Sequence, residues 1–152
     1  MEYLIRDCKE ADLPVLVELC QKHAEFEQAA YHPEGKEELL QNALFSKNKR
    51  LFCLVVEVDS LVVGYTSYTF DFSTWDARQF LYMDCLYLES DFRGFGIGEK
   101  LIDKLKEIAN LHNCVNIQWQ TPVFNGRAIK FYERIGAEGK EKVRFTLAFN
   151  PL

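Results

Sequence analysis

Three glycines in one short segment are the strongest candidates for a chemical role in this sequence. Gly94, Gly96 and Gly98 alternate with other residues between an expected strand and a long expected helix. Glycine lets neighbouring backbone N–H groups point the same way, and the start of a helix adds a partial positive charge. Together they form a cradle for an anion such as a pyrophosphate. The same glycines would also suit a turn without a ligand, so the loop alone leaves both possibilities open.

Other nucleotide-binding patterns fit this segment poorly. A Walker loop requires Gly-Lys-Ser/Thr, whereas Gly98 is followed by Glu99, Lys100 and Leu101. A dinucleotide-binding loop has the spacing Gly-x-Gly-x-x-Gly and follows an early strand. The glycines here have a different spacing and lie well into the second half of the chain. The sequence therefore disfavours both of these nucleotide-binding classes.

Strands and helices that alternate along the chain must position the loop. In order, we expect a strand at 3–6, a helix capped by Asp12 with Pro14 in its first turn, a helix around 39–44, strands at 51–58 and 61–70 joined by a turn at 59–60, a loop at 71–76, a strand at 80–88, a helix at 98–112, a strand at 115–120, a helix capped by Asn125 and ended by Gly136, and a closing strand at 143–149. Leu101, Leu105, Ile108 and Leu111 mark the expected buried stripe of the long helix. The pattern predicts a mixed α/β fold in a single domain over residues 1–152.

Length and composition agree with one folded domain. The chain has 152 residues, of which 48% are hydrophobic and 14% aromatic, enough for a packed core. Its formal net charge is −5, and no run of Lys or Arg would follow a phosphate backbone, which argues against nucleic-acid binding. No apolar run approaches the ~20 residues that a membrane span needs. We expect no membrane partner.

The cysteines and the N-terminus favour a cytoplasmic protein. Five widely spaced cysteines include no C-x-x-C pair, so neither a disulfide framework nor a zinc site is expected. His23, His32 and His112 lack metal-ligand spacing, and we interpret them as surface or locally hydrogen-bonded residues. The first residues carry neither a basic leader nor an apolar signal core.

The segment Arg93-x-x-Gly96-x-Gly98 resembles the Arg/Gln-x-x-Gly-x-Gly/Ala signature of the GNAT acetyltransferase superfamily. The expected order of elements resembles that fold from residue 3 to residue 149. Two further segments, 75–98 and 131–136, resemble the diamine acetyltransferases, the spermidine/spermine and thialysine group. The resemblance implies a mostly antiparallel mixed sheet with splayed central strands and flanking helices. It also implies a homodimer, in which the closing strand would pair with its partner.

The resemblance implies that acetyl-CoA is the co-substrate. We expect no metal. In that family the CoA pyrophosphate lies on the glycine loop and the pantetheine arm pairs with the preceding strand like an extra strand. The matching positions are Arg93, Gly94, Phe95, Gly96, Ile97, Gly98 and Glu99 on the loop, Leu86, Tyr87 and Leu88 on the strand, and Asn125 and Ala128 across the groove.

The resemblance further implies an acetyl transfer to an amine. Tyr132 matches the tyrosine that protonates the departing thiolate, a role that O–H groups serve in general acid catalysis. The amine must lose a proton, because alkyl amines titrate near ~10.4. Asp84 matches a substrate-contacting position and would orient or deprotonate the amine, with Phe26 and Glu27 as further substrate contacts. Together, Glu25, Glu27 and Asp84 would form an acidic entrance to the site that selects a polyamine or a basic amino-acid side chain.

The sequence departs from the family pattern at two places and leaves rivals open. Met83-Asp84-Cys85 stands where Leu-Glu-Asp is usual, and Ile135 where a basic residue is common. The acceptor could instead be a protein or antibiotic amine, and a CoA-binding sensor without catalysis would keep the glycine loop alone. Cys85 could carry the acetyl group covalently, or it could be a buried structural thiol.

Overall fold

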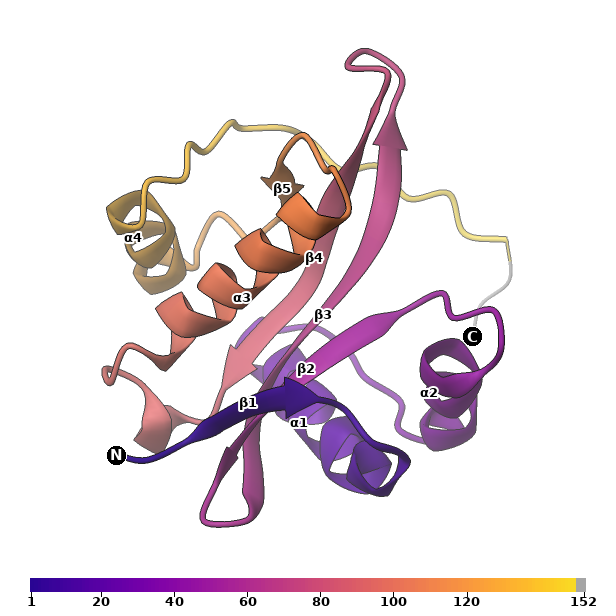
Figure 1. Ribbon diagram of the computed structural model, residues 1–152, viewed down its shortest axis with the longest axis vertical. Coiled ribbons are helices and arrows are strands. Elements are labelled where there is room, and N and C mark those ends of the chain that lie inside the picture. Colours follow the sequence, from indigo (N-terminus) through magenta and orange to yellow (C-terminus); the bar gives the residue numbers. More distant parts are fainter. Residues whose placement is uncertain (150–152) are drawn as a thin grey trace. The chain divides into compact units, whose positions relative to one another are not determined.

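Residues 1–149 are described by a computed structural model, in which the chain forms two compact units. The first unit spans Met1–Gln120 and contains a five-stranded sheet, and the second begins at Thr121. Figure 1 traces these elements along the chain. The prediction of one domain over residues 1–152 stays a prediction.

The sheet is mixed and mostly antiparallel, as predicted. Its strands are β1 (Leu4–Asp7), β2 (Phe52–Val58), β3 (Leu61–Ser73), β4 (Arg78–Leu88) and β5 (Ile117–Gln118), in the order β1-β2-β3-β4-β5. The first three pairings are antiparallel, and β4 pairs with β5 in parallel. The last pairing joins only Leu81 to Ile117 and Tyr82 to Gln118, so β5 is shorter than the strand predicted at 115–120. Beyond Tyr82, β4 has no strand partner on this side within the described residues.

Helices cover both faces of the sheet (Figure 1). Helix α1 (Leu13–Phe26) packs with α2 (Lys36–Phe45) against Val55 and Tyr65, two inward residues of β2 and β3. Helix α3 (Ile97–Leu111) crosses the opposite face beside β4. Its buried residues are Ile97, Leu101, Ile102, Leu105 and Ala109. The predicted stripe is therefore right at Leu101 and Leu105, only half-buried at Ile108, and wrong at Leu111, which is exposed.

The two hairpins set the length of the sheet. Asp59 and Ser60 both adopt positive φ angles, 49° and 66°, the backbone of a tight two-residue turn between β2 and β3, as predicted. The loop predicted at 71–76 is wrong in its first half, because Asp71–Ser73 continue β3 and pair with β4. Cross-strand pairing outweighs the low strand propensity of Asp71 and Ser73.

The start of α1 also differs from its prediction. Asp12 occupies the N-cap position, but its side chain makes no capping hydrogen bond to α1. Its carboxylate instead accepts from Arg6 at 2.7 Å and 3.0 Å and from the Lys9 N–H at 2.8 Å. An almost buried carboxylate gains more from a paired guanidinium than from a helix N–H. Asp12 therefore fastens α1 to β1.

The second unit contains α4 (Gly126–Arg134). Asn125 is its N-cap residue, although its side chain donates to Thr121 Oγ1 at 3.3 Å and makes no capping bond. Gly136 ends the helix as predicted, with a φ of 97°, and the bonds from Gly136 N to Glu133 O and from Ala137 N to Tyr132 O complete the usual glycine C-cap.

The closing strand predicted at 143–149 is wrong. These residues form no strand, and Val143, Phe145, Leu147 and Phe149 are exposed. Alternating apolar residues require a neighbouring strand to pair with, and none is paired with them in the described chain. A separate observation concerns membranes: none of the helices formed by residues 1–149 combines the length and apolarity needed to span one.

Candidate active site

A bulge in β4 presents Asp84. Ser67 of β3 lies opposite Cys85, and Tyr68 lies opposite Met83, so Asp84 is the extra residue of the bulge. Bulges commonly redirect side chains beside functional sites. A carboxylate in an otherwise apolar strand would be costly if it were buried, but the Asp84 side chain is exposed. The bulge makes Asp84 accessible to a ligand.

The end of β4 has one open edge. Leu86, Tyr87 and Leu88 pair with β3 on one side, and no described strand pairs with them on the other. Thr66 Oγ1 donates to the Cys85 carbonyl at 2.8 Å, which fixes the strand at the bulge. An open edge offers backbone donors and acceptors to an extended ligand. The predicted cofactor-binding strand therefore has an edge on which an extended ligand could pair.

The glycine loop leads directly into α3. Gly94 and Gly96 have φ angles of 85° and 80°, a region that favours glycine, and Gly96 is the N-cap residue of α3. The first N–H groups of a helix lack acceptors within it, and here they begin at Ile97. Ile97 is only 1% exposed and its side chain belongs to the core, so this side chain is not available to a ligand. These features suit an anion, as the sequence predicted.

Arg93 holds the neighbouring elements together. Its Nε donates to the Leu88 carbonyl at 2.7 Å. Its guanidinium lies 5.0 Å from the Phe26 ring centroid and 5.5 Å from that of Tyr87. Arg93 was predicted to bind the cofactor, and the structure gives it these protein contacts. It brings Phe26, a predicted substrate residue, next to the glycine loop.

The acidic residues predicted for the acceptor come from different elements. Glu27 is the C-cap residue of α1, and its carboxylate lies 2.7 Å from His23 Nε2. Asp84 accepts from the Cys85 thiol at 3.6 Å. Glu25 is exposed.

Cys85 is poorly suited to a covalent role. Burial raises the pKa of its thiol to about 12, and the nearby Asp84 charge acts in the same direction. A thiol is nucleophilic as its thiolate, which is scarce at neutral pH with such a pKa. The structure favours the structural thiol over an acetyl-cysteine intermediate.

Tyr132, Asn125 and Ala128 belong to the second unit. Tyr132 lies on α4, with its ring centroid 5.4 Å from that of Phe131, and Ala128 lies on the same helix. Asn125 precedes this helix, and its carbonyl accepts from Ile129 N. Their predicted roles beside Asp84 and the glycine loop stay predictions.

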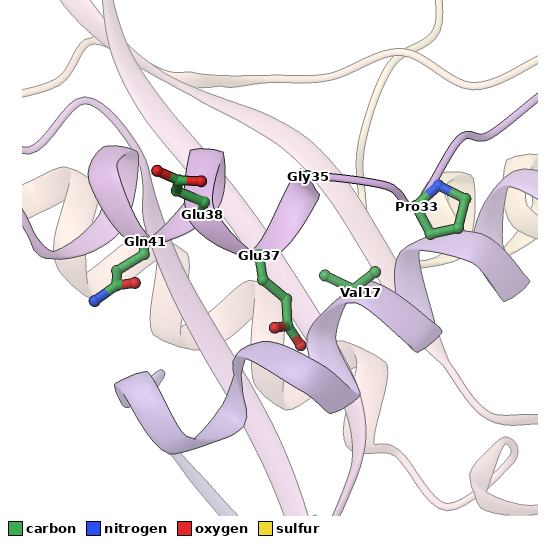
Figure 2. A pocket seen from close by; sticks show the side chains of 6 residues that line it. All are labelled: Val17, Pro33, Gly35, Glu37, Glu38 and Gln41. Atoms are coloured by element: carbon green, nitrogen blue, oxygen red, sulfur yellow. The ribbon is translucent and has the colours of Figure 1, made fainter.

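A separate cavity of about 450 Å³ lies between α1 and α2 (Figure 2). Its lining residues are Val17, Pro33, Gly35, Glu37, Glu38 and Gln41, none of which was predicted for the site. Among residues 1–149, no group of three His, Cys, Asp or Glu side chains is arranged to hold a metal ion. The glycine loop, β4 and the end of α1 remain the candidate site in the first unit.

Sequence reasoning missed two residues beside this site. His23 and Tyr65 form a hydrogen-bonded pair between α1 and β3. The spacing of His23 and Glu27, one helical turn apart, signals their contact, and could have indicated this group. Nothing in the sequence indicates Tyr65, because it is brought there by strand pairing.

Comparison with known proteins agrees with this geometry. Residues 16–137 match the Acetyltransferase (GNAT) family, across both units. The thialysine N-epsilon-acetyltransferase of Mus musculus is 32% identical over 153 residues, covering 95% of this chain and 89% of that protein. The Homo sapiens spermidine/spermine N(1)-acetyltransferase-like protein 1 is 27% identical, covering 90% of this chain and 21% of that protein.

Solved structures agree in fold. The aminoglycoside N-acetyltransferase AAC(6')-Iy in complex with CoA has a TM-score of 0.80 and 16% identity, covering 97% of this chain and 95% of that one. Such a likeness shows the fold, and the family match and the mouse relative add the enzyme class. The chain belongs to the acetyltransferase (GNAT) family and is an acyltransferase enzyme.

Proposed function

We propose that this enzyme transfers the acetyl group of acetyl-CoA to a primary amine of a small polyamine or a basic amino-acid-like acceptor, in a ternary complex. The observation that carries the proposal is the open edge of β4 running into the glycine loop and the start of α3. The names of the thialysine and spermidine/spermine relatives support the acceptor class.

The first unit offers a fitting site for acetyl-CoA. Backbone N–H groups from Gly94 to Glu99 would bind the pyrophosphate, because glycine geometry and the helix start both favour an anion there. The backbone of Leu86–Leu88 would pair with the pantetheine arm and polarise the thioester carbonyl. The aminoglycoside N-acetyltransferase of the same fold is in complex with CoA, which supports CoA as the group bound here.

The acceptor amine would lie beside Asp84. An alkyl amine is almost wholly protonated at pH 7, since its pKa is ~10.4. Asp84, exposed on the bulge, would attract the ammonium and take its proton directly or through a water. Glu27 and Phe26 would contact the rest of the acceptor. Each negative carboxylate favours a cationic acceptor over a neutral one.

Tyr132 would supply the proton to the departing thiolate. As the amine nitrogen bonds to the carbonyl carbon, the carbon–sulfur bond breaks and its electron pair goes to sulfur. A nearby O–H group stabilises that charge and completes the thiol. We also propose that the enzyme acts in the cytoplasm as a homodimer.

A CoA-release assay with acetyl-CoA and an amine panel tests the proposal. The panel contains spermidine, putrescine, lysine, thialysine and an aminoglycoside, with Tyr132→Phe as the variant. We expect amine-dependent thiol release that falls at least ~10-fold in the variant. Turnover with the aminoglycoside and with no other amine would mean that the acceptor is an antibiotic amine and not a polyamine or basic amino acid. Acetyl-CoA binding without any turnover would favour an acceptor outside the panel or a sensor, and no binding would overturn the proposal.

A further inference from the structure

His23 lies at the junction of the acceptor and cofactor sides of the first unit. It is in the last turn of α1, four residues before Glu27. Its Nε2 lies 2.7 Å from Glu27 Oε2, and its Nδ1 lies 3.3 Å from the Tyr65 hydroxyl. Its ring stacks on Tyr87 of β4, with centroids 5.3 Å apart. Two hydrogen bonds and one stacked ring therefore hold the imidazole.

The His23 and Tyr65 side chains are mostly shielded from solvent. The His23 side chain is 13% exposed, and Tyr65 is 1% exposed. Burial raises the pKa of the Tyr65 phenol far above its usual value, so its O–H stays protonated and available as a donor. A buried hydroxyl needs a partner, and His23 Nδ1 provides an acceptor.

The partners determine how neutral His23 is protonated. Glu27 can only accept while ionised, so Nε2 carries the proton and Nδ1 accepts from Tyr65. If His23 gains a second proton, both ring nitrogens donate and the Tyr65 hydroxyl must donate elsewhere. The Cys20 and Cys85 thiols lie beside that hydroxyl. The contact with Glu27 is therefore kept in both charge states.

Glu27 is held at both its main chain and its side chain. Its N–H donates to the His23 carbonyl at 3.0 Å, and Gln28 then leaves the helix with a φ of 59°. His23 holds the Glu27 carboxylate through Oε2. The second oxygen, Oε1, would accept a hydrogen bond from the cationic acceptor.

Three other charged side chains near this group have contacts of their own. Lys22, the neighbour of His23 on α1, contacts Glu89 at 2.6 Å. Arg93 and His23 both contact the Tyr87 ring, and Arg93 donates to the Leu88 carbonyl. Asp84 accepts from Cys85, whose thiol lies by Tyr65. Glu27 and Asp84 thus lie at the two ends of one group of neighbouring side chains, in which Tyr65 and Cys85 are adjacent.

We propose that His23, backed by Tyr65, is a positioning residue that fixes the Glu27 carboxylate for the cationic acceptor. The proposal rests on the proposed function for the identity of the acceptor as an amine. Without His23, the Glu27 side chain would rotate in solvent, and binding would have to order it again. The acceptor KM should therefore respond, while acetyl-CoA binding should not.

A mutant cycle tests this role. In His23→Leu we expect the acceptor KM to rise about 10-fold, the range of a lost hydrogen bond to a charged group, with kcat and the acetyl-CoA KM within about 2-fold. His23→Gln keeps a donor for Glu27 and should restore part of the loss, and Tyr65→Phe should give a smaller rise. In a Glu27→Gln background, His23→Leu should add less than about 2-fold. His32→Gln, an exposed histidine, is the matched control.

A second readout does not need a substrate. Nitrogen-15 NMR of the wild type should show the neutral His23 ring protonated at Nε2, and Glu27→Gln should weaken that preference. Unchanged acceptor KM in His23→Leu, or an equal rise in both backgrounds, would overturn the positioning role. If the wild type acetylates no amine, the proposed function fails. The NMR experiment still tests the His23–Glu27 contact in that case: an unchanged His23 tautomer in Glu27→Gln would overturn it.

Discussion

At the scale of single residues, the position of a carboxylate in the fold decides what it can do. Asp84 and Asp12 are both acidic residues of the first unit, yet one is exposed on a bulge and the other is almost buried beside Arg6. Asp84 is free to meet a ligand, whereas Asp12 is committed to the fold. Substitution of Asp84 should therefore affect activity, and substitution of Asp12 should affect stability.

For Asp84→Asn we expect kcat/KM for the amine to fall at least ~10-fold, because the amide can neither accept the proton nor attract the ammonium. The melting temperature and the acetyl-CoA KM should stay near the wild-type values. Steady-state kinetics with both substrates checks this. Asp76→Asn, an exposed aspartate at the turn before β4, is the control. An equal loss in both variants would contradict the role of Asp84.

Asp12→Asn should lower stability instead of activity. Arg6 and the Lys9 N–H depress the pKa of the Asp12 carboxyl below its usual value of 3.8. A lowered folded-state pKa stabilises the protein above the unfolded value, and this gain is lost as the pH falls through the folded value. We expect a cost of about 1–3 kcal/mol at pH 7. Urea unfolding should show the difference from the wild type shrinking below about pH 4.

The exposed pair of Lys106 and Asp103 provides the comparison for Asp12. Their atoms lie 3.8 Å apart on the surface of α3. Surface pairs contribute about 0–1 kcal/mol, so Asp103→Asn should change stability little at any pH. A cost for Asp12→Asn that is equally small, or that does not depend on pH, would contradict the assignment.

At the scale of elements, the start of α3 joins fold to function. Gly96→Ala places a side chain where φ is 80°, which costs about 1–2 kcal/mol although no atom lies within 4 Å of the added carbon. The backbone would relax away from the left-handed angle and misdirect the N–H groups. We expect acetyl-CoA affinity to fall about 10-fold by calorimetry, a change of ~1.4 kcal/mol.

Gly35 makes a closely matched control for Gly96. It also precedes a helix, has a φ of 77° and has open space around it, but it lies at the start of α2. Gly35→Ala should cost similar stability and leave acetyl-CoA binding unchanged. Equal loss of binding in the two variants would mean that the Gly96 effect is general destabilisation.

Much of this element scale was predictable from sequence, and the errors have physical causes. The long helix and the turn at Asp59 and Ser60 follow from local pattern and turn chemistry, so their predictions held. The extension of β3 to Ser73 depends on pairing with β4, which no local signal contains. For the site, the glycine loop was visible in sequence, whereas Tyr65 beside His23 required the fold.

At the scale of the whole molecule, the exposed segment 143–149 bears on the proposed homodimer. Its apolar residues alternate, as in a strand with one buried face, yet it pairs with no strand within the described chain. Phe145 is 90% exposed and Phe149 92%. A second copy of the chain would cover such a face and satisfy its backbone.

We therefore expect light scattering to give twice the 17.7 kDa of one chain. The double substitution of Phe145 and Phe149 by Glu should shift the mass to one chain, because buried charges without partners oppose association. Leu39→Glu, on an exposed position of α2, should remain dimeric. A monomeric wild type would rule out the homodimer, and a double variant that stays dimeric would place the interface elsewhere. In the monomeric variant, acetyl-CoA binding should persist, because the glycine loop and the β4 edge both lie in the first unit of one chain.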